Sequence, residues 1–190
     1  DEIRSSKYIY SLTDELFPEV KKQLRAGNKV LVCGAPCQIS GLYTFLKKDY
    51  ENLITCDFIC KSVNSTKVFQ KYIEWLENKY KSKAKKIKAK DKTTGWHRFS
   101  MRVDFENGKS YVADRYNDPF FVGYLQTELF TMEACFNCQF RGFPRPADIT
   151  LADFWGIENV DKSMDQDLGT SLIIVNSKKG REYYESLGDA

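Results

Sequence analysis

Two short apolar runs, each followed by a helical pattern, constrain the fold of this 190-residue chain most strongly. The runs are 29–33 (KVLVC) and 53–60 (LITCDFIC), whose length and composition are typical of buried strands. A helix is expected at 39–46 after the first run, and a strongly amphipathic helix at 65–80 after the second. This strand–helix–strand–helix order predicts two parallel strands joined by right-handed crossovers, and therefore an α/β unit.

The rest of the chain adds antiparallel features to this unit. Asn107-Gly108 lies between two alternating runs and predicts a β-hairpin. We expect strands at 8–12, 85–90, 97–105, 109–113, 148–154 and 171–176, and helices at 14–25, 118–130 and from 177 onward. Together these segments predict one α/β domain over residues 1–190, with a mixed, partly parallel sheet flanked by helices, a β-hairpin and a cysteine-bearing loop.

Composition and charge narrow the class of protein. Hydrophobic residues make up 42% of the chain and charged residues 29%, a balance typical of soluble globular proteins. We expect no membrane span and no signal segment, because no stretch approaches about 20 apolar residues. The net charge of +3 does not favour a nucleic-acid partner, and the lysine-rich stretch 79–92 is interpreted as a solvated edge strand. The start at Asp1 and a final helix that is cut short suggest a piece of a longer protein.

Six cysteines in a lysine-rich chain without a targeting segment indicate a reducing cytoplasm, where clustered thiols bind metal or do redox work. A secreted, disulfide-bonded protein is the less favoured alternative. Cys33 and Cys56 lie within the apolar strand runs and are interpreted as buried packing residues.

The other four cysteines form a candidate ligand set. Cys37 follows the first strand and Cys60 ends the second, so parallel strands would bring both thiols to the same sheet edge, where α/β proteins bind ligands. Cys135 and Cys138 form a CxxC in a loop. Four sulfur ligands suit a 4Fe–4S cluster and also structural zinc, and spacing alone does not separate the two. A thiol–disulfide enzyme using Cys135 and Cys138 is a third possibility.

The remaining candidate residues, outside the cysteines, give weaker indications of function. The loop 34–38 leads from a strand into a helix N-terminus, a weak signal for a phosphate or a flavin pyrophosphate that also fits a simple turn. His97, the single histidine, has no acidic neighbour in sequence and predicts no hydrolase. Asp148 and Asp153 are candidates for flavin contacts or for turn caps.

At this point the sequence resembles a known family, the C-terminal domain of coenzyme F-420 (deazaflavin) hydrogenase/dehydrogenase beta subunits. The composite of matching stretches runs in family order over nearly the whole chain. The stretches are SKY at 6–8, VLVCGAPCQISGL at 30–42, CFNCQF at 135–140, ADITLADFWGI at 147–157 and GTSLIIVNSKKG at 169–180.

The resemblance implies an oxidoreductase in which FAD and a 4Fe–4S cluster exchange electrons with coenzyme F-420 or another low-potential partner. It implies cluster ligation by Cys37, Cys60, Cys135 and Cys138. The flavin contacts that it implies fall on Lys7, Gly34, Ala35, Pro36, Gln38, Asp153 and Ser171. No residue is assigned as a catalytic acid or base. A zinc-stabilised binding module on the same four thiols remains the alternative.

Two departures from the family pattern affect these expectations. The family often has Cys-His-Gly-Val-Pro-Ser after the second strand, whereas this chain has CKSVNS at 60–65. The thiol is kept, but the changed loop leaves the substrate open. Members also commonly carry a ferredoxin-like segment ahead of this domain, so we expect such a domain upstream or a separate redox partner subunit, together with a small-molecule electron carrier.

Overall fold

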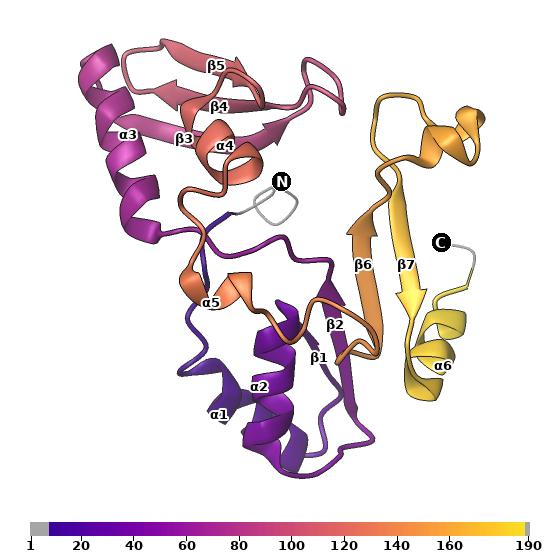
Figure 1. Cartoon of the computed structure of the whole chain (residues 1–190). Helices are drawn as coiled ribbons and strands as arrows, with labels where there is room; N and C mark the ends of the chain where they lie inside the picture. The colour runs from indigo at the N-terminus through magenta and orange to yellow at the C-terminus, as the bar shows by residue number, and fades with distance from the viewer. Residues whose placement is uncertain (1–7, 189–190) are drawn as a thin grey trace. The chain divides into compact units, whose positions relative to one another are not determined.

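Two sheets organise the protein (Figure 1), whose computed structural model describes residues 8–188. One sheet contains, in spatial order, β1 (Val30–Cys33), β2 (Leu53–Phe58), β6 (Ile149–Asp153) and β7 (Ser171–Val175). The other contains β3 (Ala84–Asp91), β4 (Ser100–Phe105) and β5 (Ser110–Asp114). The mixed α/β class predicted from the sequence is confirmed.

The described chain divides into two units around these sheets, and each unit combines segments that are distant in sequence. The mixed-sheet unit comprises residues 11–61, 138–157 and 170–188, and the antiparallel unit comprises 8–10, 62–137 and 158–169. That residues 1–190 form one domain stays a prediction.

Parallel pairing in the mixed-sheet unit follows the sequence expectation. β1 and β2 are parallel, with Val30 opposite Leu53 and Cys33 opposite Cys56. β6 continues the parallel order on the other side of β2, and β7 runs antiparallel to β6. The carboxyl ends of β1, β2 and β6 therefore lie at one edge of the sheet, together with the start of β7.

Three helices belong to this unit: α1 (Leu16–Arg25), α2 (Pro36–Leu46) and α6 (Lys178–Ser186). α2 begins at Pro36, three residues earlier than predicted, because the fixed φ of proline suits the first helical position. Apolar side chains of α1 and α2 pack with the sheet in a core of Val20, Leu24, Val32, Ile39, Leu42, Leu46, Leu53 and Ala147.

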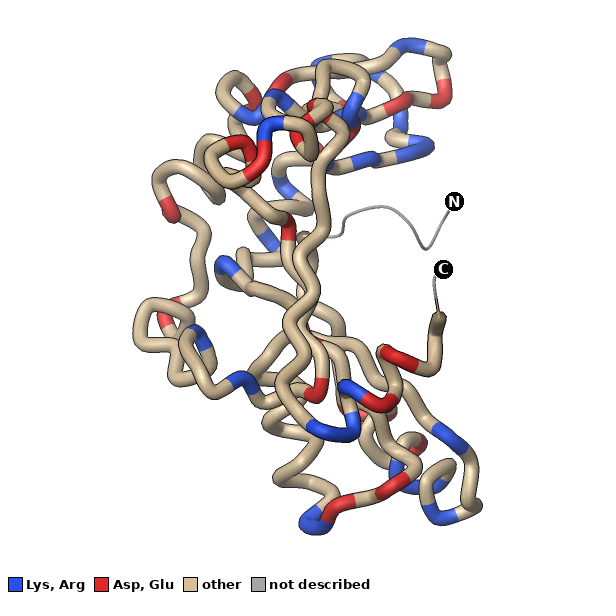
Figure 2. The backbone as a smooth tube through the Cα atoms, turned by 90° about the vertical axis from the view of Figure 1, so that its right-hand side faces the viewer, with Lys and Arg blue, Asp and Glu red and all other residues tan. Residues whose placement is uncertain are grey.

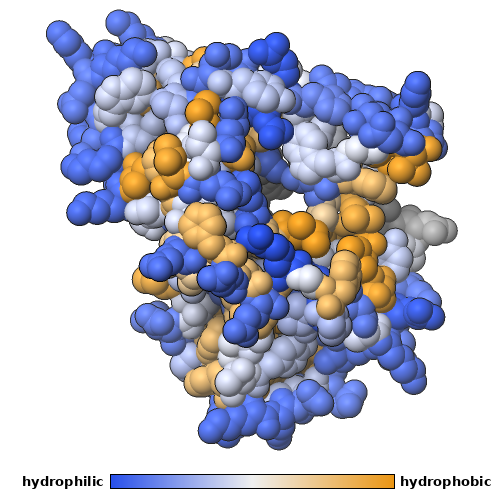
Figure 3. Space-filling model, viewed as in Figure 1, coloured by the Kyte–Doolittle hydropathy of each residue, from blue (hydrophilic) through white to orange (hydrophobic). Residues whose placement is uncertain are grey.

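The two faces of the mixed sheet differ in exposure. The helix-covered face includes Val32 and Leu53, both buried. The opposite face carries Leu31, Phe58, Leu151 and Ile173, all between 41% and 56% exposed. Figure 3 shows apolar residues at the surface where β6 and β7 lie.

Two cysteines also lie on this open face. Cys56 is buried, as predicted. The prediction that Cys33 is buried was wrong, because its strand lies at the sheet edge and its thiol is exposed.

The antiparallel unit packs α3 (Thr66–Tyr80) with its three-stranded sheet. β4 and β5 form the predicted hairpin, with Gly108 at φ +81 in the turn. The buried core consists of Tyr72, Leu76, Ala89, Phe99, Met101, Val103, Phe105, Tyr111, Phe120 and Phe121.

The helix predicted at 118–130 is only partly correct. A three-residue helix α4 (Pro119–Phe121) passes into a π-helix η1 (Val122–Gln126), and Glu128 ends the helical stretch with φ +56. Gly123 allows this arrangement, because a Cβ there would lie 2.3 Å from the ring of Phe130. Beyond it, the predicted cysteine loop begins as a short helix, α5 (Glu133–Phe136).

No strand forms at 8–12, where an Asn64 amide donates to the Tyr8 carbonyl in place of strand pairing. The lysine-rich β3 is an edge strand, as predicted, and lysines and acidic residues are interspersed over its unit (Figure 2). Two 3-10 helices, η2 (Ile157–Asn159) and η3 (Lys162–Met164), complete the elements. Across residues 8–188, no helix has the length and apolar character needed to span a bilayer.

Candidate functional site

The carboxyl edge of the mixed sheet carries two of the candidate ligands. Cys37 is the second residue of α2, directly after the loop that leaves β1, and its side chain is exposed. Cys60 lies two residues beyond the end of β2 and is half-buried. Because β1 and β2 are paired in register, both cysteines follow neighbouring strand ends at one edge.

The backbone N–H groups of the loop between β1 and α2, at Gly34 and Ala35, already have hydrogen-bond acceptors within the protein. Gly34 N–H donates to the Cys56 carbonyl at 3.0 Å, and Ala35 N–H donates to Gln38 Oε1 at 2.9 Å. Pro36 has no amide hydrogen, and Gln38 N–H donates to the Ala35 carbonyl at 2.9 Å. The Gln38 side chain also donates to the Ser11 carbonyl at 2.9 Å. A flavin role for these residues stays a prediction, and an anion bound by the Ala35 amide would have to displace Gln38.

Asp153 and Ser171 lie at the same edge. Asp153 ends β6, and Ser171, which begins β7, is its partner in the ladder. Both residues are exposed. A carboxylate beside a hydroxyl can accept and donate hydrogen bonds to a polar ligand. Lys7, the remaining flavin candidate, lies outside the described residues.

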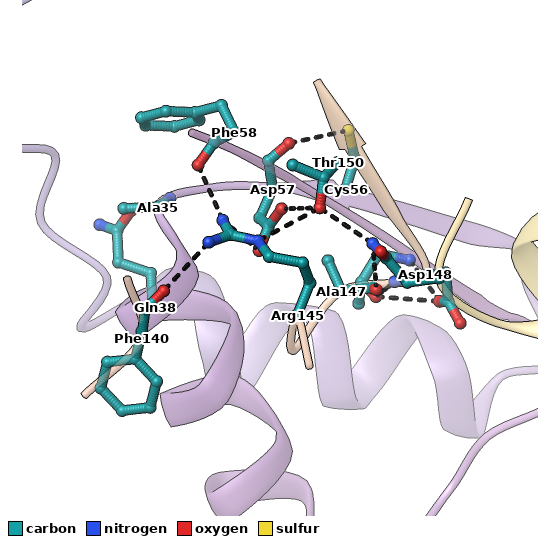
Figure 4. Close-up of polar contacts among 12 residues, drawn as sticks. Ala35, Gln38, Cys56, Asp57, Phe58, Phe140, Arg145, Ala147, Asp148 and Thr150 are labelled. Carbon is teal, nitrogen blue, oxygen red and sulfur yellow. Dashed lines mark hydrogen bonds and ion pairs between the residues drawn. The ribbon is translucent and has the colours of Figure 1, made fainter. Parts of the chain in front are cut away.

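A buried arginine joins two cysteine-bearing segments (Figure 4). The Arg145 guanidinium donates to Asp57 Oδ2 and to the Phe58 carbonyl, both at 3.0 Å, and to the Phe140 carbonyl at 3.1 Å. The side chains of Arg145 and Asp57 are 1% and 0% exposed. Phe58 precedes Cys60 by two residues and Phe140 follows Cys138 by two, so this arginine ties the segment after Cys138 to the end of β2.

Thr150 completes the surroundings of this ion pair. Its hydroxyl donates to Asp57 Oδ1 and accepts from Arg145 Nε at 3.4 Å and from Asn176 Nδ2 at 2.9 Å. A buried ion pair is stable only when its remaining donors and acceptors find partners, and these contacts reach all three guanidinium nitrogens and both carboxylate oxygens. We call Arg145, Asp57 and Thr150 the arginine clamp.

Asp148 has a structural role on the covered face. Its Oδ2 accepts from the Thr55 amide and hydroxyl, both at 2.9 Å, and its Oδ1 accepts from the Ser177 hydroxyl at 2.6 Å. Lys179 Nζ lies 3.9 Å from Oδ2. Asp148 therefore joins β2 to Ser177, and it is the Ser177 side chain that caps α6.

The CxxC motif is divided between the two units. Cys138 belongs to the mixed-sheet unit, whereas Cys135, in α5, belongs to the antiparallel unit. Within the latter, Val63 N–H donates to Cys135 Sγ at 3.4 Å. Amide donors of this kind tune the potential of sulfur-ligated clusters. Whether the four thiols bind one group stays a prediction.

Among residues 8–188, no group of three or more His, Cys, Asp or Glu side chains is arranged so that it could hold one metal ion. A single zinc needs sulfur ligands at about 2.3 Å from one centre, whereas each thiolate of a 4Fe–4S cluster can bind a different iron. The zinc alternative stays open beside the cluster.

His97 has an acidic neighbour that its local sequence does not show. His97 Nε2 lies 3.0 Å from Asp165 Oδ2, 68 residues later. This carboxylate raises the pKa of His97, and His97 N–H donates to Asp167 Oδ1 at 2.8 Å. These contacts join the 158–169 segment to the loop that precedes β4. None of these contacts includes a nucleophilic side chain.

Comparison with known proteins identifies the fold family. A family model for the C terminus of the beta subunit of coenzyme F420 hydrogenase/dehydrogenase matches residues 27–190. The chain belongs to this family. The resemblance noted in the sequence is thereby confirmed, and so is membership of an oxidoreductase family. A search of curated proteins finds no match.

Among solved structures, this beta-subunit domain is similar to a chain of the xenon-derivatised F420-reducing NiFe hydrogenase complex from Methanosarcina barkeri. The TM-score is 0.56 at 20% sequence identity, over 98% of this chain and 57% of that chain. At this identity the likeness shows the fold. The present chain therefore spans 57% of the length of the solved chain that it matches.

The arginine clamp was missed by sequence reasoning, although one signal was present. Asp57 is a carboxylate within an otherwise apolar strand run, and a buried charge requires a partner. The sequence shows the need for a cation but does not identify Arg145, which lies 88 residues away.

Proposed function

We propose that this domain transfers electrons between FAD, a 4Fe–4S cluster and a deazaflavin or another low-potential redox partner. The cluster ligands in this proposal are Cys37, Cys60, Cys135 and Cys138. When bound, the cluster supplies one-electron chemistry and the flavin exchanges one or two electrons. Family membership supports the redox role, and the sheet-edge arrangement supports the choice of thiols.

The observation that carries the proposal is the arginine clamp together with the strand ends. Two cysteines follow neighbouring parallel strands, and the clamp fixes the backbone after Cys138 to the backbone before Cys60. Cys135 is three residues from Cys138, so chain length alone keeps their Cα atoms within about 11 Å. A site held by buried contacts loses little conformational entropy when a ligand binds.

The chain's own residues have defined tasks in this proposal. The four thiols lose their protons on ligation, and the Val63 amide donates to the Cys135 sulfur. Asp153 and Ser171 supply polar contacts for the flavin at the sheet edge. The partner is a redox protein or subunit, or a ferredoxin-like domain ahead of this one, and the site of action is the cytoplasm.

Anaerobic preparation followed by metal and flavin analysis tests the proposal. We expect about four irons per chain with matching acid-labile sulfide, and a flavin absorbance in the visible blue. Stoichiometric zinc with neither iron nor flavin would identify a zinc-stabilised module and reject the redox proposal.

A further inference from the structure

Two cysteines outside the proposed cluster ligands are direct neighbours across β1 and β2. Cys33 and Cys56 are paired in register, so both side chains lie on the open face of the mixed sheet. Paired strands lie about 4.7–4.9 Å apart, within the Cα separation of about 4.4–6.8 Å that a disulfide spans. The backbone thus already places the two residues at bridging distance.

The two thiols differ in exposure. Cys33 lies on the edge strand β1 and is exposed, whereas Cys56 lies on the inner strand β2 and is 8% exposed. A reagent in solution therefore meets Cys33 first. Cys56 reaches Cys33 without needing access to solvent.

Hydrogen bonding between the thiols favours reaction at Cys33. Cys56 Sγ donates to the Asp57 carbonyl at 3.6 Å. A hydrogen bond between Cys56 and Cys33 also lowers the pKa of Cys33 to about 7, although partial burial of Cys33 and the negative charge of Asp57 act in the opposite direction. The same hydrogen bond, with burial and the charge of the Cys33 thiolate, raises the pKa of Cys56. Thiolates are the reactive form of cysteine, so Cys33 is the nucleophile of the pair.

The surroundings of the pair are apolar. Leu31 and Ile54 precede the two cysteines as ladder partners on the same face, and Ile149 lies opposite Cys56 on β6. Within the described residues no third donor completes a metal site with them. Two adjacent thiols without a third ligand suit disulfide exchange better than metal binding.

We propose that Cys33 and Cys56 form a thiol–disulfide site that closes to an intramolecular disulfide on reaction with a low-molecular-weight disulfide. This site is separate from the four proposed cluster ligands, and its chemistry does not depend on a bound cluster.

Exchange proceeds in two balanced steps. The Cys33 thiolate attacks one sulfur of the oxidant RSSR, forming a mixed disulfide and releasing RS⁻. This step removes the thiolate charge and the hydrogen bond that raise the pKa of Cys56. Cys56 then loses its proton to RS⁻ and attacks the Cys33 sulfur, releasing the second RS⁻, which takes a proton from water. The protein gives up two electrons and two protons, and RSSR becomes two RSH.

Oxidised glutathione is the probe for the test, applied to the full chain under anaerobic conditions. We expect the wild-type protein to lose two hydrogens of mass, with no glutathione retained. Cys33 and Cys37 share the tryptic peptide 30–47, and Cys56 and Cys60 share 49–61, so fragment ions must locate the bridge between these peptides. The expected bridge joins Cys33 to Cys56.

Variants separate the two steps. Cys56→Ser should stop at a stable mixed disulfide on Cys33, and Cys33→Ser, at an exposed position that tolerates change, should give no bridge to Cys56. Cys37→Ser and Cys60→Ser are matched controls on the same peptides and should still close. A bridge to Cys37 or Cys60, or wild-type protein that retains glutathione on Cys33, would overturn the proposal. Failure of closure leaves the cluster analysis unaffected, and absence of iron does not affect closure.

Discussion

Each face of the mixed sheet contains residues that depart from the usual relation between polarity and burial. On the covered face, Thr55, Asp57 and Thr150 are polar and fully buried. On the open face, Leu31 and Ile173 are apolar and about half exposed. Phe58 and Leu151, next to Asp57 and Thr150 on the same two strands, are both 41% exposed, so the difference comes from what each face contacts.

The covered face shows how a buried charge fixes a site. Water cannot solvate Asp57 there, so its partners are protein groups. Arg145 follows the segment that contains Cys138, and Thr150 lies on β6, which ends at Asp153. The open face shows the opposite arrangement, in which apolar side chains are exposed and Cys33 is accessible beside the buried Cys56. We therefore expect substitutions on the covered face to change stability far more than those on the open face.

Removal of the clamp should give the largest effect. Arg145→Met leaves the Asp57 carboxylate buried without a cation, which costs about 3–5 kcal/mol of unfolding free energy. Urea unfolding followed by circular dichroism measures this. The matched control is Lys71→Met, in an ion pair whose side chains are 68% and 54% exposed, where we expect a loss of less than about 1 kcal/mol. Equal losses in the two variants would contradict the role of the clamp.

A matched pair of substitutions compares the faces directly. Val32→Thr on β1 and Ile173→Thr on β7 both alter edge strands of the same sheet, and both keep a β-branched side chain. Val32 is 6% exposed, so its replacement buries a hydroxyl and should cost about 1–3 kcal/mol. Ile173 is 44% exposed, and its replacement should change stability by less than about 0.5 kcal/mol. The same denaturation assay decides, and a larger loss at Ile173 would show that the open face is covered in solution.

The smallest effect concerns the exposed pair of His97 and Asp165. Asp165 raises the pKa of His97, and His97 lowers the pKa of Asp165. The pair therefore adds stability while His97 is charged and Asp165 ionised, and this stability is lost as pH rises through the folded-state pKa of His97. His97→Gln should lower the melting temperature slightly at about pH 5.5 and leave it unchanged at about pH 8.5. A difference that grows toward alkaline pH would contradict this assignment.

Local pattern was sufficient for part of the fold. The parallel pairing of β1 and β2 could be predicted because each apolar run is followed by a helix, and the Asn107-Gly108 turn fixed the hairpin. The π-helix after Phe121 was not predictable, because it depends on the contact between Gly123 and the Phe130 ring. Helical periodicity does not report such contacts.

The positions of some candidate site residues, but not of all, could be predicted from the sequence. Cys37 and Cys60 followed from strand-end reasoning, whereas the exposure of Cys33 depends on which strands lie at the sheet edge. Asp57 signalled the need for a cation, but the chain has 29 lysines and arginines, and only the packing of β6 beside β2 brings Arg145 to it. Long-range partners of this kind need three-dimensional information.

Iron content across four single variants tests the central claim most directly, namely that the proposed ligands, which include Cys60 and Cys138, hold the cluster and the open-face thiols do not. After anaerobic preparation we expect Cys60→Ser and Cys138→Ser to lose most of the iron, and Cys33→Ser and Cys56→Ser to keep the wild-type content of about four per chain. Loss of iron from the open-face variants, with full occupancy in Cys60→Ser and Cys138→Ser, would contradict it.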